Sequence, residues 1–360
     1  MKTLPLAPYM AWAKSRPVPR FDLAGSNVLA CTIDDLEGAR ERLDLSGRNE
    51  EGYEPLLHAI ARQYGVRPEQ VTTAQGTSGA NFQVCAALLE PGDDVLVERP
   101  GYDPLLGAPR LLGARVVRFD RIHEDGYSLD PDRVKASITP RTKLIVITSA
   151  HNPTGVVAHR TSLQTVGEIA ARSGAHVLVD EVYLDTAELP MQTAATLGDV
   201  FISSNSLTKS YGLASLRCGW TLSSPAVAER IRRARDVIDG TGSLVAERLS
   251  VLAFEQLDRL RGRARTLLAA NRALLGGFLD ECAALDWVEP PGGTVMFPRI
   301  KGVNDAGRFV ERLLAERQTA VVPGRFFDAP AHFRLGFGGA PENVRGGLEA
   351  LNAAIAAREW

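Results

Sequence analysis

Residues 206–212 read SLTKSYG and lie between two short apolar runs, residues 200–203 and residues 218–222. Lys209 in this stretch is one of only six lysines in a chain that has 41 lysines and arginines together. A lysine amine can lose its proton and form a Schiff base, whereas arginine stays protonated in proteins. Lys209, with hydroxyls before it and a glycine after it, is therefore the first candidate for a catalytic group.

Short apolar runs like those beside Lys209 recur along the chain, and stretches of helical length separate most of them. They cover residues 95–98, 115–119, 144–148 and 176–180. Strands that alternate with helices in this way indicate a mostly parallel sheet with right-handed crossovers. The sequence therefore predicts an α/β fold.

The regions around this alternation have other patterns. Residues 1 to about 40 are expected to be irregular, because four prolines precede Phe21. Apolar residues at helical spacing predict a helix over residues 53–64. A long helical stretch over residues 224–279, with a break at residues 239–242, leads into a smaller α+β region that ends at the carboxyl terminus.

Composition excludes several classes of function. The 360 residues are 45% hydrophobic with a net charge of −2, which argues against nucleic acid and against an anionic membrane surface as partners. The four cysteines are scattered without the spacing of a disulfide framework or a metal site. No apolar run approaches the roughly 20 residues that span a bilayer. We therefore expect a cytoplasmic protein without a metal ion.

Asp180 ends the apolar run that precedes it, and Tyr183 follows three residues later. A buried carboxylate is costly unless it is paired, so Asp180 needs a cationic partner. A protonated pyridine nitrogen would serve, although an arginine or a helix cap would serve equally well. An imine-forming Lys209, Asp180 for a pyridinium and Arg217 for a phosphate are together what pyridoxal 5′-phosphate (PLP) requires of a protein.

Three more segments fit the same ligand, and each has a simpler explanation. Gly76, Thr77 and Ser78 open a helical run and offer backbone N–H groups to a phosphate, or they cap an ordinary helix. Asn152 lies in a Pro-Gly turn after residues 144–148, where α/β sheets bind ligands or where the chain simply turns. Tyr102 follows residues 95–98, and its ring could stack on a planar cofactor or pack in a core.

Together these residues follow the ends of successive predicted strands in one order. On that evidence the chain resembles a fold-type I PLP-dependent enzyme of the class I/II aminotransferase family over nearly its whole length. The resemblance implies a large PLP-binding domain over residues 46–280, with a mostly parallel seven-stranded type of sheet flanked by helices. It also implies a smaller α+β domain formed by residues 1–45 and residues 281–360, and a homodimer.

The resemblance also implies a role for each residue. Lys209 matches the lysine that carries PLP and then moves the proton, and Asp180 matches the partner of the pyridinium. Tyr102 would stack on the ring, while Asn152 and Tyr183 would contact its oxygen. The phosphate would be held by Gly76, Thr77, Ser78, Ser206 and Arg217.

Substrate binding is implied at two further positions. Arg334, in the sequence HFRL over residues 332–335, matches the arginine that grips the substrate α-carboxylate with a bidentate fork. Gly25 matches a glycine beside that carboxylate, and Asn152 lies near it as well.

One position departs from the family. The family has a tyrosine five residues before the glycine that matches Gly52, and it reaches the phosphate of the partner subunit. This chain has Gly47 there. Either Arg48 or Tyr53 takes over the contact, or the contact is missing.

The function implied is transamination, in which an α-amino acid or related amine gives its amino group to a keto acid by a ping-pong mechanism. A PLP-dependent lyase, β-eliminase or cyclase would use the same Schiff base at Lys209 and stays open. Residues 206–209 also match the S-x-x-K pattern of serine acylases, but the sequence has neither K-T-G nor S-D-N. A PLP-binding regulatory domain would need an additional DNA-binding segment, for which the short amino-terminal region leaves no room.

Overall fold

A computed structural model describes residues 7–187, 192–358 and 360 of the chain. Its centre is a seven-stranded sheet in which β8 runs antiparallel to both of its neighbours and the other pairs are parallel. In spatial order the strands are β2 (Val71–Gln75), β8 (Cys218–Leu222), β7 (Phe201–Ser206), β6 (His176–Asp180), β5 (Thr142–Thr148), β3 (Asp94–Arg99) and β4 (Arg115–Asp120). The predicted mostly parallel α/β sheet is confirmed.

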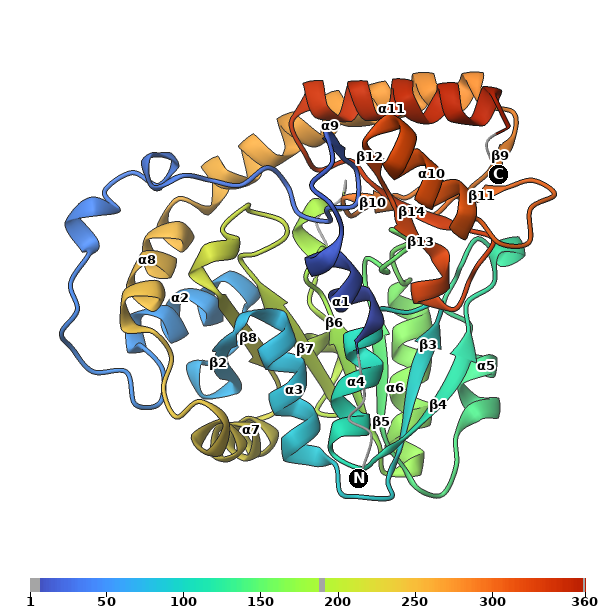
Figure 1. Cartoon of the computed structure of the whole chain (residues 1–360). Coiled ribbons are helices and arrows are strands. Elements are labelled where there is room, and N and C mark those ends of the chain that lie inside the picture. The colour runs from blue at the N-terminus through green and yellow to red at the C-terminus, as the bar shows by residue number, and fades with distance from the viewer. Residues whose placement is uncertain (1–6, 188–191, 359) are drawn as a thin grey trace.

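Helices cover both faces of this sheet (Figure 1). Alternate residues of β3 serve the two faces, because Val95 and Val97 belong to one buried cluster and Leu96 to another. The helices that contribute to the first cluster are α3 (Gly76–Leu88), α4 (Asp103–Leu111) and α7 (Pro225–Ile238). Those that contribute to the second cluster are α5 (Pro131–Ser137) and α6 (Arg160–Ser173). A sheet buried on both faces explains why its strands read as short apolar runs.

The six apolar runs predicted as strands all form strands of this sheet, and β7 extends furthest beyond the predicted end of its run. It continues to Ser206, three residues beyond the predicted end. Ser204, Asn205 and Ser206 are polar but fully buried, and they pair with β8. A hydrophobic pattern cannot detect a buried strand end that is made of polar residues.

The predicted helices are also present. α2 (Glu54–Tyr64) occupies the helix expected over residues 53–64. The long helical stretch is interrupted at residues 239–243, between α7 and α8 (Leu244–Glu255), as expected. A second junction at Gln256, before α9 (Leu257–Glu281), was not expected. Among the residues that the structure describes, no helix has both the length and the apolar character needed to cross a bilayer.

A separate buried cluster lies above the large sheet, where the orange and red carboxyl-terminal elements gather (Figure 1). It is built around helices α9, α10 (Gly307–Arg317) and α11 (Pro341–Ala356). The short strands of this carboxyl-terminal region are β9 (Leu285–Asp286), β10 (Val295–Met296), β11 (Arg299–Ile300), β12 (Thr319–Ala320), β13 (Val322–Pro323) and β14 (Phe333–Gly336). The amino-terminal strand β1 (Phe21–Asp22) pairs with β12, so the two ends of the chain meet here.

The expectation that residues 1 to about 40 are irregular is wrong in part. Residues 8–15 form helix α1 (Pro8–Ser15), whereas residues 1–6 lie outside the described part of the chain. Pro8 stands at the first helical position, where its missing N–H costs nothing. The rings of Tyr9 and Trp12 pack against each other and against Phe326. Contacts with the distant carboxyl-terminal region therefore support a helix that the prolines had concealed.

Candidate active site

The carboxyl ends of β2, β3, β5, β6 and β7 lie at one edge of the large sheet, and a cavity of about 330 Å³ opens there. This cavity brings together nine of the residues predicted from the sequence: Thr77, Ser78, Tyr102, Asn152, Asp180, Tyr183, Ser206, Lys209 and Arg217. Three others lie just outside its lining. Gly76 is beneath Arg217, Gly25 adjoins Ser26 of the lining, and Arg334 is buried behind Asn152 and Tyr9.

Lys209 follows β7, and its side chain reaches across the cavity to the amino-terminal segment. Its Nζ donates to Ser26 Oγ at 2.9 Å and to Asn27 Oδ1 at 2.7 Å, while its carbonyl accepts from the backbone N–H of Val28 at 3.0 Å. Burial, helped by the positive charge of Arg334, lowers the pKa of Lys209 to about 7. A large share of this amine is therefore neutral near pH 7, as a nucleophile or a general base requires.

Asp180 ends β6 and is held in place from two sides. Its Oδ2 accepts from Asn81 Nδ2 at 2.8 Å, and its Oδ1 accepts from the N–H of Val182 at 3.2 Å. Ser204 Oγ donates to Asn81 Oδ1 at 2.6 Å, which fixes how the amide is turned. Burial raises the pKa of Asp180 to about 6, although the Asn81 hydrogen bond acts in the opposite direction. A carboxylate in this setting is stabilised by a cation.

Small residues and hydroxyls surround Arg217 at the other end of the cavity. Gly76 begins α3 with a φ of +70°, and a Cβ there would collide with the Arg217 guanidinium. Thr77 Oγ1 donates to Ser206 Oγ at 2.9 Å, and the N–H of Thr208 donates to the same oxygen at 3.3 Å. A helix amino terminus, three hydroxyls and a guanidinium together form a site suited to a phosphate.

Tyr183 and Tyr102 also line this cavity. The Tyr183 hydroxyl is buried near Ser26 without a hydrogen bond of ordinary geometry to any described residue, and burial raises its pKa to about 12. The Tyr102 hydroxyl donates to Met10 Sδ at 3.4 Å, and burial raises its pKa as well. An unpaired hydroxyl that faces a cavity is suited to a ligand oxygen.

Arg334 lies on β14 and is fully buried. Its Nη1 donates to Asn152 Oδ1 at 3.0 Å, and its Nη2 donates to Tyr9 Oη and to Ala24 O, each at 2.8 Å. Gly25, the predicted neighbour of a substrate carboxylate, directly follows Ala24 in this group. The structure thus joins residues from both ends of the chain at one side of the cavity.

Sequence reasoning did not single out several residues that shape this site: Tyr9, Met10, Ser26, Asn27 and Asn81. A local signal could have found Asn81, because it lies one helical turn after Thr77 and so shares its face of α3. Residues 25–27 could be read from the sequence only as a turn. No local pattern marks Tyr9, because its partners lie more than 90 and more than 300 residues away.

The polar groups in the cavity match the chemical groups of PLP. The Arg217 end offers positive charge and hydroxyl groups to a phosphate, and Asp180 offers a carboxylate to a protonated ring nitrogen. Tyr183 offers a hydroxyl that lacks a partner among the described residues to a ring oxygen. Lys209 offers a partly neutral amine to an aldehyde. On these observations the residues present fit the cofactor.

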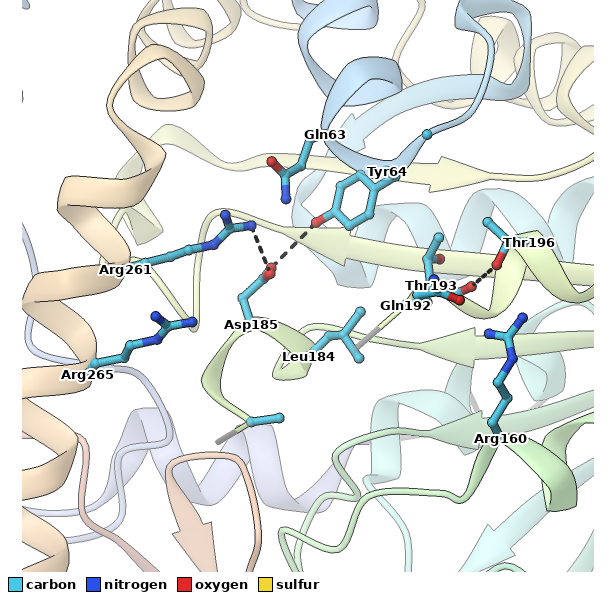
Figure 2. A pocket seen from close by; sticks show the side chains of 12 residues that line it. Gln63, Tyr64, Arg160, Leu184, Asp185, Gln192, Thr193, Thr196, Arg261 and Arg265 are labelled. Atoms are coloured by element: carbon cyan, nitrogen blue, oxygen red, sulfur yellow. Dashed lines mark hydrogen bonds and ion pairs between the residues drawn. The ribbon is translucent and has the colours of Figure 1, made fainter. Parts of the chain in front are cut away.

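A larger cavity of about 560 Å³ contains none of the predicted residues (Figure 2). Its central carboxylate, Asp185, is paired with Arg261 Nη2 at 3.2 Å and accepts a long hydrogen bond from Tyr64 at 3.5 Å. Arg160 and Arg265 at its rim are exposed to solvent. With its central charge satisfied and its other cations solvated, this cavity offers no chemistry that competes with the smaller one.

The departure at Gly47 has a structural counterpart. Gly47 has a φ of +146°, and a Cβ there would lie 2.8 Å from Arg248 Nη2. Arg248 holds the preceding loop through hydrogen bonds to Asp44 O at 2.9 Å and Ser46 O at 2.6 Å. Arg48, one candidate to replace the missing tyrosine, is 89% exposed and paired with Glu50 at 3.0 Å. A side chain at residue 47 would therefore strain the backbone and push aside the end of the Arg248 side chain.

Residues 37–351 match the sequence model of the family described as aminotransferase class I and II. The chain is 31% identical over 365 residues to capreomycidine synthase from Streptomyces vinaceus, in an alignment that covers 98% of this chain and 94% of that protein. It is 30% identical over 296 residues to a probable N-succinyldiaminopimelate aminotransferase from Mycobacterium tuberculosis, with 78% and 74% covered. The crystal structure of a PLP-dependent aminotransferase from Streptococcus suis superposes with a TM-score of 0.93 at 31% identity, covering 99% of both chains.

Proposed function

The chain belongs to the class I and II aminotransferase family, and from that premise we propose that Lys209, Asp180 and Arg334 carry its reaction. The enzyme depends on PLP and transfers amino groups. Its substrates are an amino acid and a keto acid, as expected for this family. The roles of individual residues follow from the arrangement of the cavity.

Bound PLP supplies an aldehyde carbon that condenses with amines and a protonated ring that withdraws electrons from the Cα of an attached amino acid. Arg217, Thr77, Ser206 and the amino terminus of α3 would hold its phosphate. Asp180 would hold the ring nitrogen in its protonated form. The remaining contacts, to the ring face and the ring oxygen, would come from Tyr102, Asn152 and Tyr183.

Lys209 is the group that moves the proton. Its Nζ has a pKa of about 7 because it is buried and lies near Arg334. It can therefore accept the proton from the substrate Cα and return it after the electrons have shifted. Arg334 binds the substrate carboxylate and so orients the Cα–H bond toward this amine. Keto acids enter the same site, so the two half-reactions alternate in a ping-pong sequence.

One observation carries this proposal more than any other: a buried lysine amine and a buried aspartate face one cavity from the ends of neighbouring strands. The test is a spectrum of the purified protein with PLP, before and after addition of a panel of amino acids and then of keto acids. A visible band that bleaches with the donor and returns with a keto acid supports the proposal. A visible band that never forms contradicts it.

The alternative reaction classes remain outcomes of the same experiment. The similarity to capreomycidine synthase over 98% of the chain favours a synthase as the second candidate. A visible band that persists while a product other than a keto acid accumulates would identify that case. Ammonia and pyruvate among the products would indicate elimination.

We also propose that the enzyme is a cytoplasmic homodimer with a large domain over residues 46–280 and a small domain over residues 1–45 and 281–360. The separate carboxyl-terminal cluster and the pairing of β1 with β12 support this division. Light scattering of the purified protein tests the dimer.

A further inference from the structure

The guanidinium of Arg334 is already engaged by groups of its own chain. Of its five N–H groups, one on Nη1 donates to Asn152 Oδ1, and both on Nη2 are used by Tyr9 Oη and Ala24 O. The Nε–H has no hydrogen-bond partner among the described residues, although it is buried. The donors left free are therefore Nε–H and one N–H of Nη1.

A carboxylate that binds an arginine through two parallel hydrogen bonds needs two donors on the same edge of the guanidinium. One such edge is formed by Nε and Nη2, and the other by Nη1 and Nη2. Each edge includes Nη2, and both of its hydrogens are taken. A substrate carboxylate can therefore grip Arg334 with two bonds only if one of the acceptors on Nη2 leaves.

The two acceptors differ in how firmly they are held. Ala24 O belongs to backbone that is fixed nearby, since Leu23 exchanges hydrogen bonds with Ala320 and Gly336 and the N–H of Ala24 donates to Asp22. The other acceptor is the hydroxyl of Tyr9, at the end of a side chain that lines the cavity. Its helix, α1, is only eight residues long. Tyr9 is therefore the acceptor that can leave.

We propose that the Tyr9 hydroxyl occupies, on Arg334, the position of the substrate α-carboxylate, so that every amino acid that binds must displace it. This rests on the proposed function, because it takes Arg334 as the carboxylate site. In the free enzyme Tyr9 pairs a charged N–H group that would otherwise be buried without a partner, which keeps Arg334 in place. Tyr9 thereby acts as a positioning residue for Arg334 until a substrate carboxylate takes the place of its hydroxyl.

Helix α1 connects this displacement to a natural reporter. The ring of Trp12 lies 6.3 Å from that of Tyr9 and 5.6 Å from that of Phe326, and the Arg16 guanidinium lies 5.5 Å from the Trp12 ring. The backbone N–H of Tyr9 is held by Asp103 Oδ2 at 2.9 Å. Displacement of the Tyr9 side chain therefore changes the surroundings of Trp12, while Asp103 keeps the start of the helix anchored.

The test uses the holoenzyme and two ligands that differ only at the carboxylate. 2-Methylalanine has no Cα hydrogen and cannot react further, and 2-methylalaninamide carries an amide in place of its acid. Each ligand is titrated into the wild type, into Tyr9→Phe and into Trp12→Phe, and its dissociation constant is measured. Trp12→Phe loosens the same helix but keeps the hydroxyl, so it controls for a general effect on α1.

Tyr9→Phe is expected to bind 2-methylalanine about tenfold more tightly than the wild type does, because the acid no longer competes with a hydrogen bond to a charged group. Its affinity for the amide is expected to stay the same, as are both affinities of Trp12→Phe. In the wild type, the acid and not the amide should change the Trp12 fluorescence. Unchanged or weaker binding of the acid by Tyr9→Phe would overturn the proposal.

Failure of the proposed function would look different. If the holoenzyme does not form, the proposed function is wrong. If the wild type binds the acid and the amide equally, Arg334 is not a carboxylate site. Either result also removes the basis for the role of Tyr9. If the wild type strongly prefers the acid and Tyr9→Phe does not improve on it, only the role of Tyr9 is wrong.

Discussion

The two sides of the cavity are built in different ways. The floor, as we call the groups at the strand ends, consists of residues 76–78, Asn152, Asp180, Tyr183, Ser206, Lys209 and Arg217. The roof consists of Tyr9, Ala24, Ser26, Asn27 and Arg334, which the pairing of β1 with β12 and the packing of α1 bring together. The floor is fixed by one sheet, whereas the roof is assembled from the two ends of the chain.

This difference separates two tasks. The floor residues, proposed to hold a cofactor that stays, lie at strand ends, in the connections beside them and in the first turn of α3. The roof residues are proposed to meet a substrate that comes and goes, and the hydroxyl of one of them, Tyr9, makes a single hydrogen bond, to Arg334. Changes in the floor should therefore alter the bound cofactor, whereas changes in the roof should alter the response to carboxylates.

Lys209→Ala is expected to have the largest effect. Without the amine, no group in the floor can move the Cα proton, and the rate of the half-reaction should fall about 10⁴-fold. Stopped-flow absorbance after mixing with an amino donor measures this rate. Lys143→Ala is the matched control, because Lys143 lies exposed on β5 and should leave the rate unchanged. Equal losses in both variants would contradict the role of Lys209.

Asp180→Asn removes the negative charge of Asp180 from the floor and keeps the shape of its side chain. Loss of one preorganised electrostatic contact should lower kcat about 100-fold. The absorbance of bound PLP should also change, because its ring nitrogen would lose the partner that keeps it protonated. If kcat is unchanged in Asp180→Asn, the reaction does not depend on a charge paired with the Asp180 carboxylate.

Arg334→Lys tests the roof. Lysine keeps the charge but cannot form two parallel hydrogen bonds, so kcat/KM for amino acids should fall about 10- to 100-fold. The spectrum of the bound cofactor should stay the same, in contrast to the floor variants. Arg325→Lys, at a partly exposed position outside the cavity lining, is the control. An altered resting spectrum in Arg334→Lys would show that floor and roof are not separate.

Gly47→Tyr introduces at residue 47 the tyrosine that the family has at this position. The positive φ of residue 47 and its proximity to Arg248 should lower the stability by about 1–2 kcal/mol, with no gain in PLP affinity. Urea denaturation and a PLP titration measure the two effects. Gly262→Ala, in an open position on α9, should not destabilise. Tighter PLP binding without a loss of stability would show that the loop can reorganise.

A further prediction concerns pH and the cofactor-free protein. The pKa of Lys209 falls from 10.5 to about 7 on folding, so between these values the unfolded chain holds a proton that the folded chain lacks. The stability of the wild type relative to Lys209→Met should therefore rise as the pH rises from about 7 toward 10.5. Thermal denaturation at several pH values measures this difference. A difference that is flat or falls across this window would contradict a lowered pKa.

The sequence was enough to predict most of the fold, because a sheet buried on both faces leaves apolar runs that can be read locally. The polar end of β7 and the helix α1 could not be read in this way. Asn205 and Ser206 are buried through contacts with β8 and α3, and α1 depends on the Phe326 region more than 300 residues away.

The candidate site divides along the same line. Floor residues follow strand ends, so position in the chain was enough to bring Lys209 and Asp180 into one cavity. The contacts of Tyr9 with Arg334, and of Asn27 with Lys209, exist only after distant segments have packed together. Their chemistry leaves no trace in the residues that surround them in the sequence.

The most direct test of the account is to locate the bond between cofactor and protein. Borohydride reduces an imine between a lysine and PLP to a stable amine, and peptide mass spectrometry then shows which of the six lysines carries the added mass. We predict that the label lies on Lys209 alone and disappears when an excess of amino donor is added before reduction. A label on another lysine, or none at all, would contradict the assignment of this cavity as the active site.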